Sequence, residues 1–225
     1  MIAGFLWRVG FGPLVRAMRE PKRLVVCYHS IAGNGQYKHI TTTLKDFTRQ
    51  IEYLTARGYR FVKFSELMDA KDRVVAVYFD DGFRDVFTNA KQILEEKKIP
   101  ATVFVTTSYA DGAKDPAIYA SWDELVALGN NWEIGSHSIS HRKLTKLSKE
   151  EVKREMIESK KIIEAKTGRV VTAFSYPHGR ASSETEALAH EAGFTLTTAD
   201  KRFHKVRPDP DDSLAVFYWK TLNLW

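Results

Sequence analysis

Three short motifs carry the residue types that bind metals and move protons. They are Asp80-Asp81-Gly82, His137-Ser-Ile-Ser-His141 and Tyr176-Pro177-His178-Gly179. Two adjacent carboxylates repel each other, and a buried acid is costly unless it is paired or binds a metal. A nearby cation resolves this cost, because one carboxylate can ligate it while the other stays free as a base. One aspartate and two histidines would give an ion three protein ligands and an open fourth position, which is typical of a catalytic site.

The two histidines of the second motif are four residues apart. His137 and His141 can both reach one ion if the segment between them forms one helical turn. Neutral imidazole nitrogens suit zinc and other late divalent metals. Each motif alone is a weak signal, since Asp-Asp-Gly and Pro-x-Gly are also ordinary turn sequences. Their shared position, each after a predicted strand, is what indicates a site.

The chain alternates short β-type runs with amphipathic helices, and each motif directly follows a run. This alternation predicts a parallel sheet in an α/β domain of barrel type. Parallel barrels place their sites at the C-terminal ends of the strands, so the three loops should meet at one mouth. The expected strands are Leu24–Tyr28, Tyr59–Val62, Val74–Phe79, Ala101–Val105, Trp132–Ile134, Ala173–Tyr176, Phe194–Thr198 and Leu214–Trp219. The expected helices are Leu44–Arg57, Asp85–Lys98, Ser121–Gly129, Ser148–Gly168 and Ser182–Ala192.

Length and composition fit one large globular domain. The chain has 225 residues, of which 44% are hydrophobic and 28% charged, so it can bury a sizeable core. The net charge of +6 mildly favours an anionic neighbour. Most lysines stand among glutamates, as after Ser148, which indicates a solvated helix face. No Walker loop or RNA-binding signature is present, so we expect no nucleic-acid partner, and a basic nucleic-acid binder has only net charge in its favour.

The first residues form a separate apolar and aromatic segment. Residues 2–18 are too short and too charged to span a bilayer, because Arg8 and Arg16 interrupt them. They also lack a basic region ahead of an uninterrupted apolar core, so we expect no cleaved secretion signal. The segment could lie in a membrane interface or pack as a helix on the domain. We therefore expect a helical extension over residues 1–20 and a catalytic domain over residues 21–225.

The three motifs together resemble those of the NodB-homology polysaccharide deacetylases, also called carbohydrate esterase family four. The resemblance runs from about Leu24 to about Trp219. The stretch Val-Cys-Tyr28-His29-Ser-Ile is similar to the first-strand motif of a branch that includes enzymes acting on exported poly-N-acetylglucosamine. The resemblance implies a deformed, parallel (β/α) barrel, usually with seven strands. It also implies hydrolysis of N-acetyl groups on sugars with one divalent metal ion.

Carried over by position, the resemblance assigns a role to each motif. Asp81, His137 and His141 match the metal ligands, and Asp80 matches the catalytic base. His178 stands where the family usually has an aromatic residue whose backbone N–H helps to bind the oxyanion. That role needs only the main chain, so the substitution is tolerable.

Two family features are missing from the sequence. Ser175 occupies the position where many members have an arginine that orients the base, and Arg207 is our candidate replacement. We expect Tyr176, Pro177 and Arg207 to contact the substrate. The last apolar run lacks the histidine that acts as general acid in many members. His29 is the leading candidate for acid or substrate contact, with His178 and His204 as alternatives, and a purely structural role for His29 stays open.

These assignments predict a metal-dependent carbohydrate N-deacetylase acting on an N-acetylated polysaccharide or glycoconjugate. Zinc is the first expectation for the metal, with cobalt, nickel and iron also compatible with the ligand set. One alternative is the same fold acting on another non-peptide C–N bond, and a second is a non-catalytic carbohydrate-binding relative. We expect a cytoplasmic or membrane-peripheral protein from the first residues, while the family resemblance also allows work outside the cytoplasmic membrane.

Overall fold

The strands form a parallel sheet that curls into an incomplete barrel. The computed structural model describes residues 22–32, 40–71, 73–199 and 214–218. Seven strands follow one another in the order β10-β1-β5-β6-β7-β8-β9, and β4 pairs with the first half of β5. These strands are β1 (Arg23–Tyr28), β4 (Arg60–Val62), β5 (Val74–Phe79), β6 (Ala101–Val105), β7 (Trp132–Ser136), β8 (Ala173–Ser175), β9 (Leu196–Thr198) and β10 (Leu214–Tyr218). The expected parallel, deformed barrel is thus confirmed, and the sheet has eight strands, one more than the seven expected.

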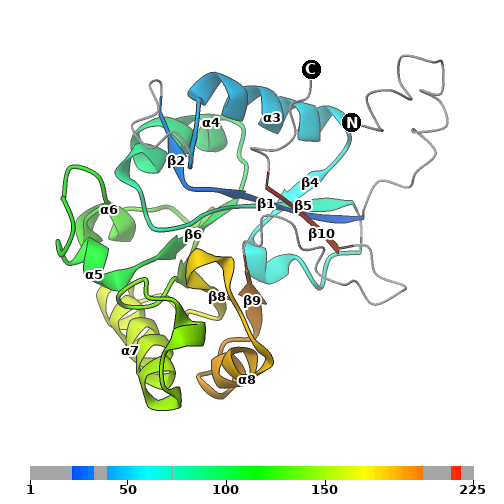
Figure 1. The fold of residues 1–225 in the computed structure, drawn as a ribbon. Helices are drawn as coiled ribbons and strands as arrows, with labels where there is room; N and C mark the ends of the chain where they lie inside the picture. The colour runs from blue at the N-terminus through cyan, green and yellow to red at the C-terminus, as the bar shows by residue number, and fades with distance from the viewer. Residues whose placement is uncertain (1–21, 33–39, 72, 200–213, 219–225) are drawn as a thin grey trace.

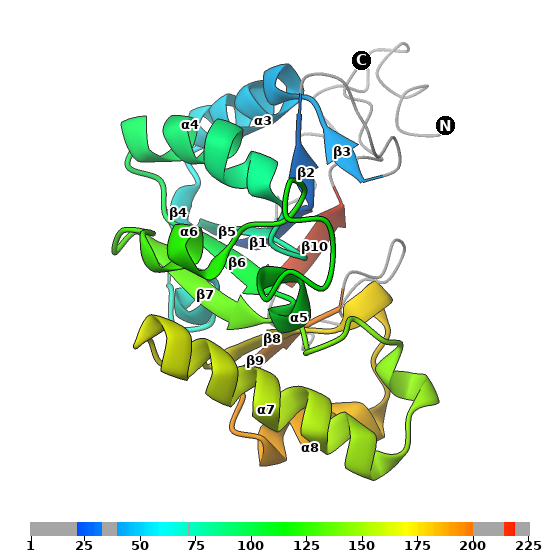
Figure 2. The same cartoon turned by 90° about the vertical axis from the view of Figure 1, so that its left-hand side faces the viewer.

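The main helices cover the outside of the curled sheet. Helices α3 and α4 lie over one part of it, and α7 and α8 lie over another part (Figures 1 and 2). The helices are α3 (Leu44–Ala56), α4 (Lys91–Glu96), α5 (Thr107–Ala110), α6 (Trp122–Val126), α7 (Lys149–Thr167) and α8 (Ser183–Glu191). Short turns are η1 (Phe64–Glu66), η2 (Val86–Ala90), η3 (Leu144–Lys146) and η4 (Pro177–Gly179), and a small pair is formed by β2 (Ser30–Ile31) and β3 (Thr41–Thr42). The predicted helix Asp85–Lys98 is split, because its first part is the π-helical turn η2.

The helix ends follow from local side-chain chemistry. Ser148 caps α7 by accepting a hydrogen bond from the backbone N–H of Glu151, whose carboxylate accepts one from Ser148 in return. Ser121 and Glu124 form the same reciprocal pair at the start of α6. Gly168 ends α7 with a φ of 67°, which glycine adopts without strain. These caps confirm the predicted beginnings of both helices.

The central strands β5 and β6 are buried on both faces, and alternate residues of β5 belong to different clusters. The outer cluster packs the sheet against α3, α4, α7 and α8 and includes Val75, Val77 and Phe79 of β5. The inner cluster fills the barrel and is formed by Val25, Cys27, Val62, Phe64, Leu67, Val74, Ala76, Tyr78, Phe104 and Ala173. Strands that are covered on both sides read as continuous apolar runs, which is why β5 and β6 were predictable from their composition.

Several expectations fall outside the described residues. The N-terminal extension over residues 1–20 and the candidates His204 and Arg207 belong to this group. The boundary between extension and domain therefore stays a prediction. In the part of the chain that the structure describes, no helix is both long and apolar enough to cross a membrane.

Candidate metal centre

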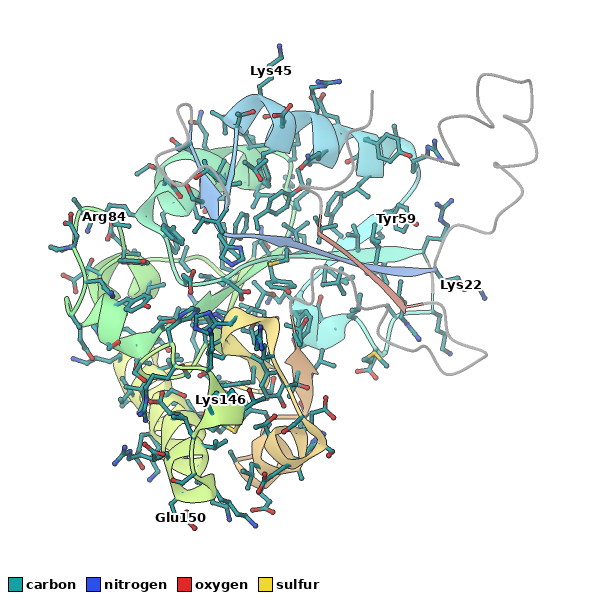
Figure 3. The ribbon with its side chains drawn as sticks, in the orientation of Figure 1. Lys22, Lys45, Tyr59, Arg84, Lys146 and Glu150 are labelled. Atoms are coloured by element: carbon teal, nitrogen blue, oxygen red, sulfur yellow. The ribbon has the colours of Figure 1, made fainter. Side chains whose placement is uncertain are left out.

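The inner face of the sheet continues into the loops that carry the motifs. Lys22, just before β1, and Arg84, just after β5, lie at opposite edges of the molecule, so the strands end on the Arg84 side (Figure 3). Side chains alternate along a strand with a period of two. The inner series of β1, β5 and β7 therefore leads to His29, Asp80 and His137 at the mouth of the barrel. Backbone hydrogen bonds from Asp80 to Tyr28 and from His137 to Val105 extend the strand pairing to these residues.

The structure brings the three predicted metal ligands together. The Nε2 atom of His141 lies 3.1 Å from Oδ1 of Asp81, and the Nε2 atom of His137 lies 3.5 Å from the same oxygen. One ligand atom from each residue lies within 4.8 Å of the other two. The Oδ1 atom of Asp81 is buried and accepts no hydrogen bond. A divalent cation would satisfy this oxygen, so the residues fit a metal site.

The tautomer of His137 is set by its neighbour in β8. Its Nδ1 lies 2.8 Å from the backbone carbonyl oxygen of Ser175, and because a carbonyl only accepts, Nδ1 carries the proton. The unprotonated Nε2 therefore faces Asp81. Such a hydrogen bond orients metal-binding histidines and makes them more basic ligands. Ser175, which stands where many family members have arginine, thus supports the site through its main chain.

Burial favours the uncharged forms of the three ligands when no cation is close. It raises the pKa of Asp81 to about 7. Burial lowers the pKa of His137 well below its usual value, and the imidazoles of His141, His29 and His178 lower it further. Burial, and then His178 and Lys114, lower the pKa of His141 to about 4. Neutral imidazole is the form that binds a metal, and a cation would favour the ionised form of Asp81.

The loop between the two histidines is not a helical turn, so the condition under which both were expected to reach one ion is not needed. Ser138 and His141 adopt φ angles of 67° and 57°, in the left-handed region. The backbone N–H of His141 donates to the Ser138 hydroxyl at 3.1 Å, which closes the loop. Asp81 and His178 also have positive φ, so four of the five such non-glycine residues in the described chain belong to the site. Strained backbone gathers at functional sites because the surrounding structure holds it there.

Asp80, the predicted base, lies beside the triad. Only 1% of its surface is exposed, and its Oδ1 lies 3.8 Å from Nδ1 of His137. His29 is also close, since its Nδ1 lies 4.0 Å from Sγ of Cys27, which in turn lies 3.7 Å from Oδ2 of Asp80. The structure therefore groups both with the ligands, while the roles of base and acid remain predictions.

The third motif contributes His178 but not the ring of Tyr176. The Nε2 atom of His178 donates to the backbone carbonyl of His141 at 3.1 Å. The centroids of the two imidazole rings are 4.5 Å apart. Tyr176 belongs to the outer cluster, and its hydroxyl donates to the carbonyl of Thr185. Pro177 is buried beside it. Contact of Tyr176 with substrate stays a prediction, and it would have to involve the main chain.

Sequence reasoning missed two residues near His141, the partly buried Tyr109 and the exposed Lys114. The ring of Tyr109 lies 6.0 Å from the His141 ring, and Lys114 Nζ lies 5.8 Å from the Tyr109 ring. Burial, and then the charge of Asp81, raise the pKa of Tyr109 to about 12, so its hydroxyl stays protonated at neutral pH. Both residues follow β6, and the rule that sites lie after barrel strands would have pointed to them.

It also missed Glu155, which is buried in α7 beside the histidine loop. An acid on the apolar side of a helix, between Val152 and Met156, was the available signal.

Comparison with known proteins gives one consistent set of matches. The sequence model of the polysaccharide deacetylase family matches residues 68–197. YxkH of Bacillus subtilis, provisionally named a polysaccharide deacetylase, is 26% identical over 221 residues that cover 90% of this chain and 77% of that protein. The poly-β-1,6-N-acetyl-D-glucosamine N-deacetylase of Staphylococcus epidermidis is 23% identical over 81% of this chain and 68% of its own. The structure of IcaB from Ammonifex degensii has the same fold, with a TM-score of 0.74, 23% identity and coverage of 89% of this chain and 92% of that one.

Proposed function

The chain belongs to the polysaccharide deacetylase family, and from this premise we propose that it is a metal-dependent hydrolase that removes N-acetyl groups from sugars of a polysaccharide or glycoconjugate. The observation that carries the proposal is the triad of Asp81, His137 and His141 with a further carboxylate, Asp80, beside it. A non-catalytic binding module would need no base next to a metal site. The staphylococcal relative, named for a poly-N-acetylglucosamine substrate, supports an N-acetylglucosamine polymer as the substrate class.

Zinc is the metal that we propose for this site. Two imidazoles and one carboxylate, with an open position, form a ligand set that catalytic zinc accepts, although cobalt, nickel and iron accept it too. Such an ion supplies Lewis-acid polarisation of the acetyl carbonyl and of the attacking water. The protein's part is to hold His137 in the tautomer with a free Nε2, through Ser175, and to keep Asp81 directed at both imidazoles.

The remaining residues handle protons and charge. Asp80 takes the proton of the attacking water as the water oxygen bonds to the acetyl carbon. The backbone N–H of His178 donates to the oxyanion that develops on the acetyl oxygen. His29 protonates the sugar nitrogen as the C–N bond breaks, so the products are acetate and an amino sugar. His178, and His204 outside the described residues, are the alternative acids.

Acetate release from a panel of N-acetylated glycans tests the proposal. We expect release from N-acetylglucosamine oligomers, loss of release after chelation, and recovery when zinc is added back. Cyclic amides and nucleoside-linked sugars belong in the same panel, because turnover of those alone would support the alternative C–N hydrolase. Metal binding without turnover of any substrate would instead support a non-catalytic carbohydrate-binding protein.

Membrane contact is a separate proposal with its own test. We infer it from the apolar and aromatic residues 2–18, which stand beside arginines in a chain of net charge +6. Sedimentation with anionic vesicles, compared with neutral vesicles and with a chain lacking residues 2–18, measures it. The compartment in which the protein works stays a prediction.

A further inference from the structure

One carboxylate from α7 holds the loop between the two histidine ligands. Glu155 has only 3% of its surface exposed. Its Oε2 accepts hydrogen bonds from the backbone N–H groups of Ile139 and Ser140, both at 2.9 Å. Its Oε1 accepts a third from the Ser140 hydroxyl at 2.5 Å. Three converging donors offset the cost of burying this charge.

The described partners of Glu155 lie in this loop and at Arg142, the residue that follows His141. Among the described residues, its carboxylate bonds to Ile139 and Ser140 and forms an ion pair with Arg142, whose Nε lies 3.5 Å away. The carboxylate therefore joins α7, which runs along the outside of the sheet (Figure 2), to the segment that carries both histidines. A carboxylate serving general stability would not need all its hydrogen-bond donors in the loop between two metal ligands.

The loop needs such a support because its backbone is unfavourable. Ser138 and His141 have positive φ angles, which residues with side chains rarely adopt. Helix α7 supplies a second support one turn further on, where Ser159 Oγ lies 2.7 Å from Ser136 Oγ. Ser136 Oγ in turn accepts the backbone N–H of Ser138 at 3.2 Å. Both supports act on the backbone beside the ligands and leave the ligand atoms untouched.

We propose that Glu155 is a positioning residue for the metal centre, which sets the separation of the His137 and His141 imidazoles by holding the backbone between them. This inference rests on the proposed metal-dependent function. Glu155 thereby strengthens metal binding without being a metal ligand itself. Changes to the outer partners of metal ligands typically weaken metal binding ~10–100-fold.

The test compares three changes at Glu155 with a matched change on the exposed side of α7. Glu155→Asp shortens the side chain by one methylene, so its carboxylate can reach the two N–H groups only if the loop moves. Glu155→Gln keeps the length and one oxygen for the N–H groups, and its amide can donate to the Ser140 hydroxyl. Glu158→Asp is the control, since Glu158 is half-exposed and pairs with Lys161 on the same helix. Glu155→Ala removes all three hydrogen bonds.

Zinc affinity is measured by competition with a chromophoric chelator, and the visible spectrum of the cobalt-loaded protein reports the coordination geometry. We expect Glu155→Asp and Glu155→Ala to bind zinc ~10–100-fold more weakly and to change the cobalt spectrum. Glu155→Gln should stay close to wild type, as should Glu158→Asp. Circular dichroism shows which variants fold, and if Glu155→Ala does not, Glu155→Asp decides.

A folded Glu155→Asp protein with wild-type zinc affinity and an unchanged cobalt spectrum would overturn the inference. It would leave the proposed function intact, because the wild-type chain would still bind metal. A wild-type chain that binds neither zinc nor cobalt would overturn both. Equal losses in Glu155→Asp and Glu158→Asp would also overturn it, since they would show a general effect on α7.

Discussion

The thiol of Cys27 lies 3.7 Å from Oδ2 of Asp80 and is oriented to donate a weak hydrogen bond to it. The other oxygen of Asp80 lies 3.8 Å from Nδ1 of His137. Asp80 is therefore placed by neighbours at both oxygens, while the ligand atoms of the triad meet at Asp81. With this arrangement Asp81 can bind the ion while Asp80 exchanges protons.

Replacing Asp80 should separate turnover from metal binding. Asp80→Asn keeps the size of the side chain but cannot take a proton from water. We expect kcat for acetate release to fall by ~10²–10⁴-fold, the usual contribution of a general base. Zinc affinity should stay near the wild-type value, because Asp80 is not a ligand. Nearly full activity of the variant would show that another group is the base.

Removing a metal ligand should weaken zinc binding itself. His141→Ala takes away one of three protein ligands, so zinc affinity should fall by more than the ~100-fold that a change to an outer partner can cause. Zinc at 100 times its Kd stabilises the wild-type fold by about 2.7 kcal/mol, and the variant should lose most of this gain in a thermal melt. His190→Ala, an exposed histidine in α8, is the control and should behave as wild type. Unchanged metal content in His141→Ala would exclude His141 from the site.

Zinc binding should depend on pH through Asp81. Burial raises its pKa to about 7, so below that pH the carboxyl group is protonated and must lose a proton to bind zinc. His141, with a pKa of about 4, is already neutral there and releases none. Apparent zinc affinity should therefore rise about tenfold per pH unit up to about pH 7 and then level off. Titration calorimetry in two buffers of different ionisation enthalpy counts the released proton. A flat profile across this range would mean that Asp81 is already ionised.

The elements of the fold were predictable because buried strands appear in the sequence as apolar runs and helix caps as recognisable residue pairs. Strands β5 and β6 match the predicted ranges Val74–Phe79 and Ala101–Val105, since both are apolar runs bounded by residues that end them. The three metal ligands were also predictable, because strand ends in a parallel barrel converge. Side chains alternate between the two faces of a strand. Applied to β8, this rule places the Tyr176 side chain on the outer face with Phe174, away from the mouth of the barrel.

The shape of the histidine loop was not predictable from local sequence. With a spacing of four, a helical turn would let His137 and His141 reach one ion, but the loop instead takes positive φ angles at Ser138 and His141. Its conformation depends on hydrogen bonds from Ile139 and Ser140 to Glu155, which lies 16 and 15 residues after them in the chain. Tertiary bonds of this kind outweigh local propensity, and only the structure shows them.

The strand that leads to His137 depends on a glycine for close packing. A Cβ at Gly135 would lie 2.5 Å from two ring carbons of Phe104 and 3.1 Å from the carbonyl oxygen of Ala173. The Phe104 ring has little room to move, because it packs edge to face against Tyr78 at 5.1 Å and Phe64 at 5.3 Å. Gly135→Ala should therefore destabilise the fold by about 1–3 kcal/mol, as overpacking does.

Urea unfolding followed by circular dichroism measures this cost as a lower midpoint with an unchanged slope. The matched control is Gly129→Ala, where an added Cβ meets nothing within 4 Å. That change should be neutral or should stabilise by up to about 1 kcal/mol, because alanine has less conformational freedom in the unfolded chain. Equal midpoints for the two variants would show that Phe104 yields to the added methyl group. A loss confined to Gly135→Ala would show that the rings inside the barrel form a rigid support below the metal ligands.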